Sequence, residues 1–122
     1  MQAQPQHGPG SAMISTAAVR VIRQYTGRGP TQAKTVITED LVTILLADTL
    51  TQGERTLADA DKADRVLRLR HDYQTAMSDD LIAIVERQLD RKVAAFMSQN
   101  HIDPDLAVEV FVLEPLAKSE AR

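Results

Sequence analysis

The chain has 122 residues, which is enough for one hydrophobic core and within the commonest size range of single domains. Hydrophobic residues make up 43% of it and aromatic residues only 3%, so the core is expected to be aliphatic. A net charge of -3 argues against a general polyanion binder, and the absence of Cys excludes disulfides, thiolate zinc sites and thiol catalysis.

The sequence predicts neither a signal peptide at residues 1–10 nor a membrane span. Residues 1–10 lack the basic and apolar regions of a signal peptide and are predicted to form a disordered tail. The most apolar stretch, residues 41–47, is far shorter than the ~20 residues that a membrane-spanning helix needs. We therefore expect a cytoplasmic protein without direct membrane insertion, with a single domain over residues 11–115 and a frayed C-terminus over residues 116–122.

The first predicted element is an amphipathic helix with Ser11 as its N-cap. Gly27, which can adopt a positive φ, is expected to end it, and residues 27–31 (GRGPT) form a turn. Two runs rich in Thr, Val, Ile and Leu follow, split by Glu39-Asp40, and they predict a β-hairpin over residues 33–47. One helix over residues 37–50 is the alternative, but the β-branched residues favour strands. The apolar stripe of the first helix is Ile14, Ala17, Ala18, Val21, Ile22 and Tyr25.

Two helices are predicted next. Thr51 and Glu54 have the spacing of a capping box, so a helix should begin at about Gln52, with a possible break at residues 59–61 where Asp offers a second N-cap. Ser78 is predicted to cap a further helix. The positions expected to face inward before Ser78 are Leu57, Ala63, Val66, Leu67, Arg70 through its stem, Tyr73 and Met77.

A second hairpin completes the chain. Residues 92–98 and 106–113 resemble strands, and the polar stretch between them (QNHIDPD) contains typical turn residues. The order helix, hairpin, two helices, hairpin predicts an α+β fold, with an antiparallel four-stranded sheet and helices packed on one face.

Residue types that carry catalysis or bind metals do not cluster. His7, His71 and His101 have no metal-like or catalytic neighbour at a useful spacing. Residues 59–64 (DADKAD) resemble the opening of a calcium loop, but the glycine and the final glutamate are missing. We expect no enzyme activity, no cofactor and no metal.

Two basic features are candidate contacts. Gly27 and Gly29 free the backbone to approach a partner, while Arg28 between them is available for a phosphate or carboxylate; a simple helix stop is compatible with that role. The predicted second helix carries a basic stripe, for which a solvated, self-neutralising face is the default interpretation. With few aromatic residues for base stacking, nucleic-acid binding through this stripe is the weaker alternative. The stripe consists of Arg55, Lys62, Arg65, Arg68 and His71.

Several motifs, spread from about Ala12 to Pro115, together resemble the MpsC-like family, a domain of unknown function. They are GRGPT at 27–31, the L-T-x-x-E-R-x-L pattern of residues 50–57, Val66 with Arg70, the V-E and K-V pairs at 85–86 and 92–93, and EVFVL at 109–113. The sequence departs from the family pattern at Leu89-Asp90, where the family has Thr-Gly.

The resemblance implies a link to a sodium-translocating, membrane-potential-generating system in which a soluble component accompanies membrane subunits. We expect a non-catalytic accessory or regulatory module that acts by protein-protein interaction with an integral membrane transport subunit. The alternative is a small regulatory domain that binds an anionic ligand or nucleic acid through Arg28 and the basic stripe. The candidate partner or anion contacts are Gly27, Arg28, Gly29, Thr31, Arg55 and Arg70.

The two hairpins also predict a homodimer. Residues 41–47 and 107–113 are apolar on both faces of the pleat, whereas helices on one side should leave the other face polar. A second copy, related by a two-fold axis, is the simplest cover. Glu109 is the exception, because in a covered face it needs a partner such as Arg70 or Lys92.

Overall fold

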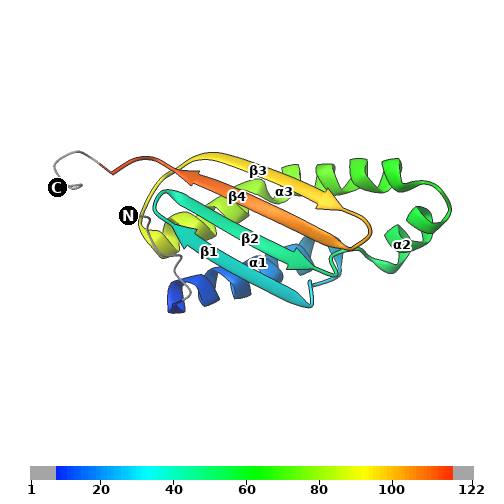
Figure 1. The fold of residues 1–122 in the computed structure, drawn as a ribbon, viewed down its shortest axis with the longest axis horizontal. Coiled ribbons are helices and arrows are strands. Elements are labelled where there is room, and N and C mark those ends of the chain that lie inside the picture. The colour runs from blue at the N-terminus through cyan, green and yellow to red at the C-terminus, as the bar shows by residue number, and fades with distance from the viewer. Residues whose placement is uncertain (1–7, 117–122) are drawn as a thin grey trace.

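In a computed structural model, which describes residues 8–116, the helices α1 and α3 lie against one face of an antiparallel sheet (Figure 1). The α+β class, the four-stranded sheet and the predicted order of helices and hairpins are confirmed for this part of the chain. The elements are α1 (Pro9–Thr26), β1 (Gln32–Thr38), β2 (Leu41–Ala47), α2 (Gln52–Asp59), α3 (Ala63–Leu89), β3 (Val93–His101) and β4 (Leu106–Leu113).

The two hairpins join through their second strands, so that the strand order is β1-β2-β4-β3. β2 and β4 are antiparallel neighbours, with Ile44 opposite Glu109. The two most apolar strands, β2 and β4, therefore lie at the centre of the sheet, where a neighbouring strand pairs with each of their edges. The second hairpin is tighter than predicted: β3 continues to His101, and Gln99 pairs with Val108, which leaves only residues 102–105 for the turn.

The first helix begins earlier than the sequence predicted. Gly8 is its N-cap and Pro9 its first residue, which suits proline because the first turn has no backbone partner for an N–H. Ser11 is buried inside the helix, so its assignment as the N-cap is wrong. Gly27 does end the helix, with φ of 83° and its N–H donating to the Arg23 carbonyl at 2.8 Å. Of the tail predicted over residues 1–10, Pro9 and Gly10 lie in α1, and residues 1–7 lie outside the described residues. Residues 117–122 of the predicted frayed C-terminus (residues 116–122) also lie outside them.

The boundary between α2 and α3 lies at residues 60–62, which agrees with the possible break predicted at residues 59–61, and no further helix begins at Ser78. The predicted capping box is present: the Thr51 hydroxyl accepts from Glu54 N at 3.1 Å, and the Glu54 carboxylate accepts from Thr51 N at 2.8 Å. α3 then runs without a break past Ser78, whose hydroxyl donates to the Thr75 carbonyl at 2.9 Å instead of capping a helix. The N-cap of α3 is Lys62 with no side-chain bond, so the predicted Asp cap is also wrong.

The core lies between the helices and the sheet. α1 contributes Ile14, Ala18 and Ile22, and α3 contributes a continuous line of buried residues at helical spacing, which explains why no break occurs at Ser78. Leu57 and Leu67, predicted to face inward, are 41% and 39% exposed. The buried line of α3 is Val66, Arg70, Gln74, Met77, Leu81, Ile84 and Val85.

α3 ends in a tight turn although the glycine of the family pattern is missing. Asp90 adopts the left-handed conformation, with φ of 53° and ψ of 45°, which Asp tolerates better than most residues. The turn that leads into β3 therefore keeps the geometry that glycine would allow.

Candidate functional site

The GRGPT segment folds back onto the link between β2 and α2, residues 48–51, which we call the junction. The Arg28 guanidinium donates to the Asp48 carbonyl at 3.0 Å, and the Thr31 hydroxyl donates to the Asp48 carboxylate. Gly29 packs closely against the Arg23 side chain, so that a Cβ added at Gly29 would lie only 2.8 Å from Arg23 Nε. Arg28 and Thr31 therefore hold the junction in place.

Asp105, in the turn before β4, binds the junction from the other side. Its Oδ1 accepts from Thr49 N at 3.0 Å and from the Thr49 hydroxyl at 3.1 Å. Its Oδ2 accepts from Leu50 N at 3.1 Å and from the Arg55 guanidinium at 3.0 Å. One carboxylate thus satisfies two backbone N–H groups and ties the second hairpin to the start of α2.

A buried ion pair lies beneath the junction. Arg70 Nη1 is 3.3 Å from Glu54 Oε1, and the two side chains are 2% and 3% exposed. The same Nη1 donates to the Thr49 carbonyl at 3.3 Å. Since an unpaired charge at this depth is costly, Glu54 and Arg70 depend on each other. Glu54 therefore has two roles, in the capping box of α2 and in this pair.

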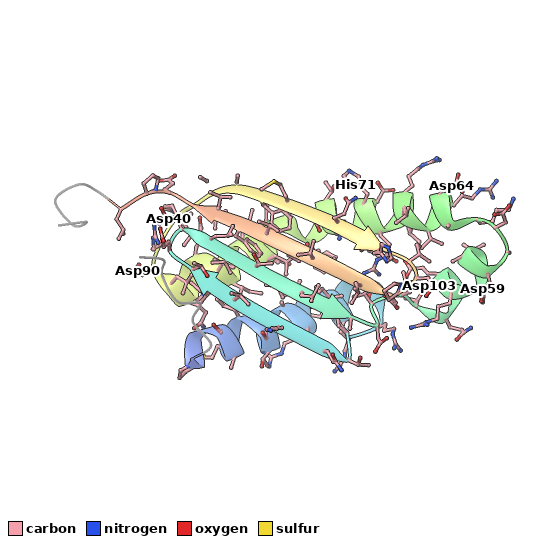
Figure 2. All side chains as sticks on the ribbon, in the orientation of Figure 1. Asp40, Asp59, Asp64, His71, Asp90 and Asp103 are labelled. Atoms are coloured by element: carbon pink, nitrogen blue, oxygen red, sulfur yellow. The ribbon has the colours of Figure 1, made fainter. Side chains whose placement is uncertain are left out.

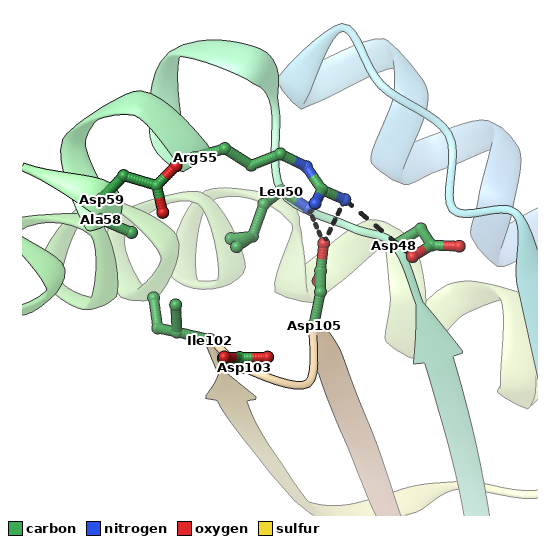
Figure 3. Close-up of a pocket in the computed structure, with 8 residues that line it drawn as sticks. All are labelled: Asp48, Leu50, Arg55, Ala58, Asp59, Ile102, Asp103 and Asp105. Atoms are coloured by element: carbon green, nitrogen blue, oxygen red, sulfur yellow. Dashed lines mark hydrogen bonds and ion pairs between the residues drawn. The ribbon is translucent and has the colours of Figure 1, made fainter.

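A cleft of about 370 Å³ opens beside the junction (Figure 3). Four carboxylates and one guanidinium line it, and Arg55 bridges Asp105 and Asp48, the latter at 3.9 Å. Among residues 8–116, no group of three or more His, Asp or Glu is arranged to hold a metal ion. The cleft is therefore an acidic recess with its one cation already paired. Its lining residues are Asp48, Leu50, Arg55, Ala58, Asp59, Ile102, Asp103 and Asp105.

Glu109 occupies the core between α3 and the sheet, with 1% of its surface exposed. It accepts hydrogen bonds from the Ser98 hydroxyl and, at 3.5 Å, from the Gln74 amide. Burial raises the pKa of Glu109 to about 7, opposed by Ser98, by Gln74 and by the charge of Arg70. Of the two predicted partners, Arg70 acts through its charge, while the hydrogen bonds come from residues that the sequence did not suggest.

The sheet face opposite the helices is open and faces the viewer in Figures 1 and 2. We call the outward positions of its four strands the open face. Within these strands, Lys34 is the only Lys, Arg, Asp or Glu on the open face. Leu45 and Met97 on this face are 45% and 52% exposed. The open face consists of Gln32, Lys34, Val36 and Thr38 in β1, Leu41, Thr43, Leu45 and Ala47 in β2, Leu106, Val108, Val110 and Val112 in β4, and Ala95, Met97, Gln99 and His101 in β3.

Four of the predicted contact residues converge on the junction, namely Arg28, Thr31, Arg55 and Arg70, and Gly27 and Gly29 shape the turn beside it. The basic stripe, which was predicted on one helix, is divided between two: Arg55 lies on α2, and the other members lie on α3 or at its N-cap. These are Lys62, Arg65, Arg68 and His71. The stripe's His71 is exposed on α3, the helix that also carries Asp64 (Figure 2).

Sequence reasoning missed Asp48 and Asp105. Both are acids in loops, where Asp is common for backbone reasons, and no spacing rule links them to Thr49 or to Arg55. The available signal was the number of arginines in the motifs, since each buried or half-buried guanidinium requires an acceptor nearby.

Fold and contacts together define a small α+β domain with an internally bonded junction and a sheet that is open on one side. The chain belongs to the MpsC family: residues 8–115 match the family described as the Na+-translocating membrane potential-generating system (MpsC). No curated protein and no solved structure matches the chain. In the part of the chain that the structure describes, no helix is both long and apolar enough to cross a membrane.

Proposed function

We propose that this chain is a non-catalytic, cytoplasmic accessory or regulatory module of a sodium-translocating, membrane-potential-generating system, and that it acts by binding other proteins. Its family membership supports the link to that system. The open face carries the proposal of protein binding, because an apolar surface that spans the central strands of a sheet is typical of an interaction site.

The distribution of side chains on the open face supports this function. Except for Thr43, the open-face residues of the central strands are apolar, including Leu41 and Leu45 in β2 and Val108 and Val110 in β4. Polar residues such as Gln32 and Gln99 lie on the outer strands. A protein interface has the same plan, an apolar centre with charged residues kept out of it and a polar rim.

Co-purification tests the proposal. The tagged chain, recovered from native membranes in mild detergent, is expected to bring an integral membrane protein with it. Recovery of soluble proteins alone would contradict a role beside a membrane transport subunit. A tagged chain of similar size and charge from another family is the control for non-specific recovery.

Binding of an anionic ligand or of nucleic acid has less support. The guanidinium groups of Arg28, Arg55 and Arg70 donate to carbonyl or carboxylate groups of the chain itself, which leaves the exposed residues of α3 as the basis for this function. Binding through Arg65 and Arg68 would weaken steeply between low and physiological salt. The absence of binding at low salt would end this alternative.

A further inference from the structure

We propose that the open face is the interface between two copies of this chain, which pair by a two-fold axis into a sandwich of two sheets with the helices outside. The inference rests on the proposed function only in that the open face binds protein, and it names a second copy of the chain as the partner that this face binds. It follows from the composition, size and symmetry of the open face.

Burial is the first argument. Leu41, Leu45 and Met97 are 43%, 45% and 52% exposed, and they are neighbours of the half-buried valines of β4 across the strand pairs. Apolar surface of this extent costs about 25 cal/mol per Å² while it stays in water. Covering it with another apolar surface is therefore favourable, and stacked sheets achieve this at a separation of about 10 Å.

Size is the second argument. Strands ~4.8 Å apart and residues ~3.4 Å apart give four strands of at least seven residues a flat area of about 450 Å². Because side chains add relief to that area, two such faces together would bury about 1,000 Å², which is the lower limit for a specific interface. The proposed dimer is accordingly of modest affinity and forms at micromolar concentration.

Symmetry is the third argument. The apolar strands β2 and β4 are central and the more polar strands β1 and β3 are outermost. A two-fold axis along or across the strands therefore places apolar residues on apolar residues and polar edges over polar edges. The open face also has a shallow depression of about 130 Å³ bordered by Leu45, Leu106 and Val108, which is roughly the size of one aliphatic side chain from the facing copy.

Charge favours a second copy over a lipid surface. Lys34 is the only Lys or Arg on the open face of the described strands, whereas attraction to anionic membranes needs a cluster of basic residues. Pairing two copies buries no acid, and Lys34 lies on the edge strand β1, where its ammonium group can remain in water.

Light scattering at tens of micromolar, with matched variants, tests the inference. The chain is expected to be a dimer, and Leu45→Lys should weaken dimerisation about 100-fold or more, because it places a charge in the apolar centre of each copy. Leu67→Lys makes the same change at a leucine of similar exposure on α3, 39% against 45%, and should leave the dimer intact. A monomeric wild type, or a dimeric Leu45→Lys, would overturn the inference.

Cross-linking provides a second measurement that does not depend on disrupting the fold. The chain has no Cys, so Thr43→Cys introduces a single thiol near the centre of the open face. Two copies paired on a central two-fold axis bring these thiols to about 9 Å, whereas a thiol at the corner residue Gln32 would be about 15 Å or more from its counterpart. A short bis-maleimide should link Thr43→Cys and not Gln32→Cys; equal yields would contradict the proposed interface.

The outcomes also separate this inference from the proposed function. If the wild type is monomeric and Leu45→Lys loses the co-purified membrane protein, the open face binds that protein and the inference of a dimer fails. If the dimer forms and no membrane protein is recovered, the inference stands and the proposed function fails.

Discussion

Asp105 holds the junction in place, although it belongs to none of the sequence motifs that contribute other residues there. Its carboxylate accepts from two backbone N–H groups, from the Thr49 hydroxyl and from Arg55. The side chain is 8% exposed, so water does not replace these bonds easily. The junction therefore depends on a negative charge at this position.

We expect Asp105→Asn to destabilise the fold by about 2–3 kcal/mol, because an amide NH₂ would face donors that now meet an oxygen. Urea unfolding followed by circular dichroism measures the loss. Asp103→Asn is the control, since Asp103 is exposed and two residues away, and it should change stability by less than about 0.5 kcal/mol. Equal effects at the two positions would contradict this account of the junction.

Glu109 should make stability depend on pH. Burial raises its pKa from 4.5 to about 7, so between these values the folded protein holds a proton that the unfolded chain releases. The contribution of Glu109 to stability is therefore fully present below pH 4.5 and is lost as the pH rises to about 7. The loss amounts to about 3 kcal/mol, from 1.36 kcal/mol per pKa unit.

Glu109→Gln isolates this effect, because glutamine keeps the shape and has no titratable proton. Unfolding free energies of both proteins, measured from pH 4.5 to 8, should differ by an amount that grows with pH in favour of the variant. Two curves that stay parallel across this range would show that folding does not raise the pKa of Glu109.

At the scale of elements, a side-chain cap marks the start of α2, whereas α3 begins without one. Thr51 and Ser78 were both predicted as N-caps from the sequence, yet only Thr51 makes the bonds of a cap. We expect Thr51→Ala to cost about 1 kcal/mol and Ser78→Ala to stay within about 0.5 kcal/mol of the wild type. Thermal or urea unfolding distinguishes the two; a larger loss at Ser78 would contradict an unbroken α3.

The strands and the capping box could be predicted because their signals are local. Alternation, β-branching and the Thr51/Glu54 spacing act within a few residues. The possible break predicted at residues 59–61 agrees with the end of α2 at Asp59, whereas the helix start predicted at Ser78 is wrong. The Ser-Asp-Asp sequence at residues 78–80 matches a helix start, but the buried line from Val66 to Val85 continues through it. Tertiary packing of that line outweighs the local preference of Ser78 for a cap.

Contacts between segments that are far apart in the chain could not be predicted from the sequence. The pairing of β2 with β4, the bond of Arg28 to the junction and the hydrogen bonds of Glu109 each join residues far apart in the chain. The motif arginines were identified correctly as unusual, but the sequence does not say whether a guanidinium binds a partner or a carbonyl of its own chain. The structure shows the second arrangement for Arg28, Arg55 and Arg70.

At the scale of the whole molecule, the fold separates two surfaces. The helices pack a line of buried apolar residues against the sheet, with single apolar residues such as Met13 and Leu67 exposed on their outer sides, and the junction bonds its arginines internally. The open face instead keeps neighbouring leucine, valine and methionine side chains partly in contact with solvent. A domain of this family with one closed and one open side fits a role as a binding module. The central claim is therefore that the open face is covered in the working protein.

Methionine oxidation tests this claim within one chain. Met97 on the open face and Met13 on α1 are 52% and 54% exposed, and Met77 in the core is 1% exposed. In an isolated monomer Met97 and Met13 should react with peroxide at similar rates, while Met77 is protected. In the purified chain at micromolar concentration, and in the complex recovered from membranes, Met97 should react about tenfold more slowly than Met13. Equal rates for Met97 and Met13 in both preparations would show that the open face stays uncovered and would contradict the account.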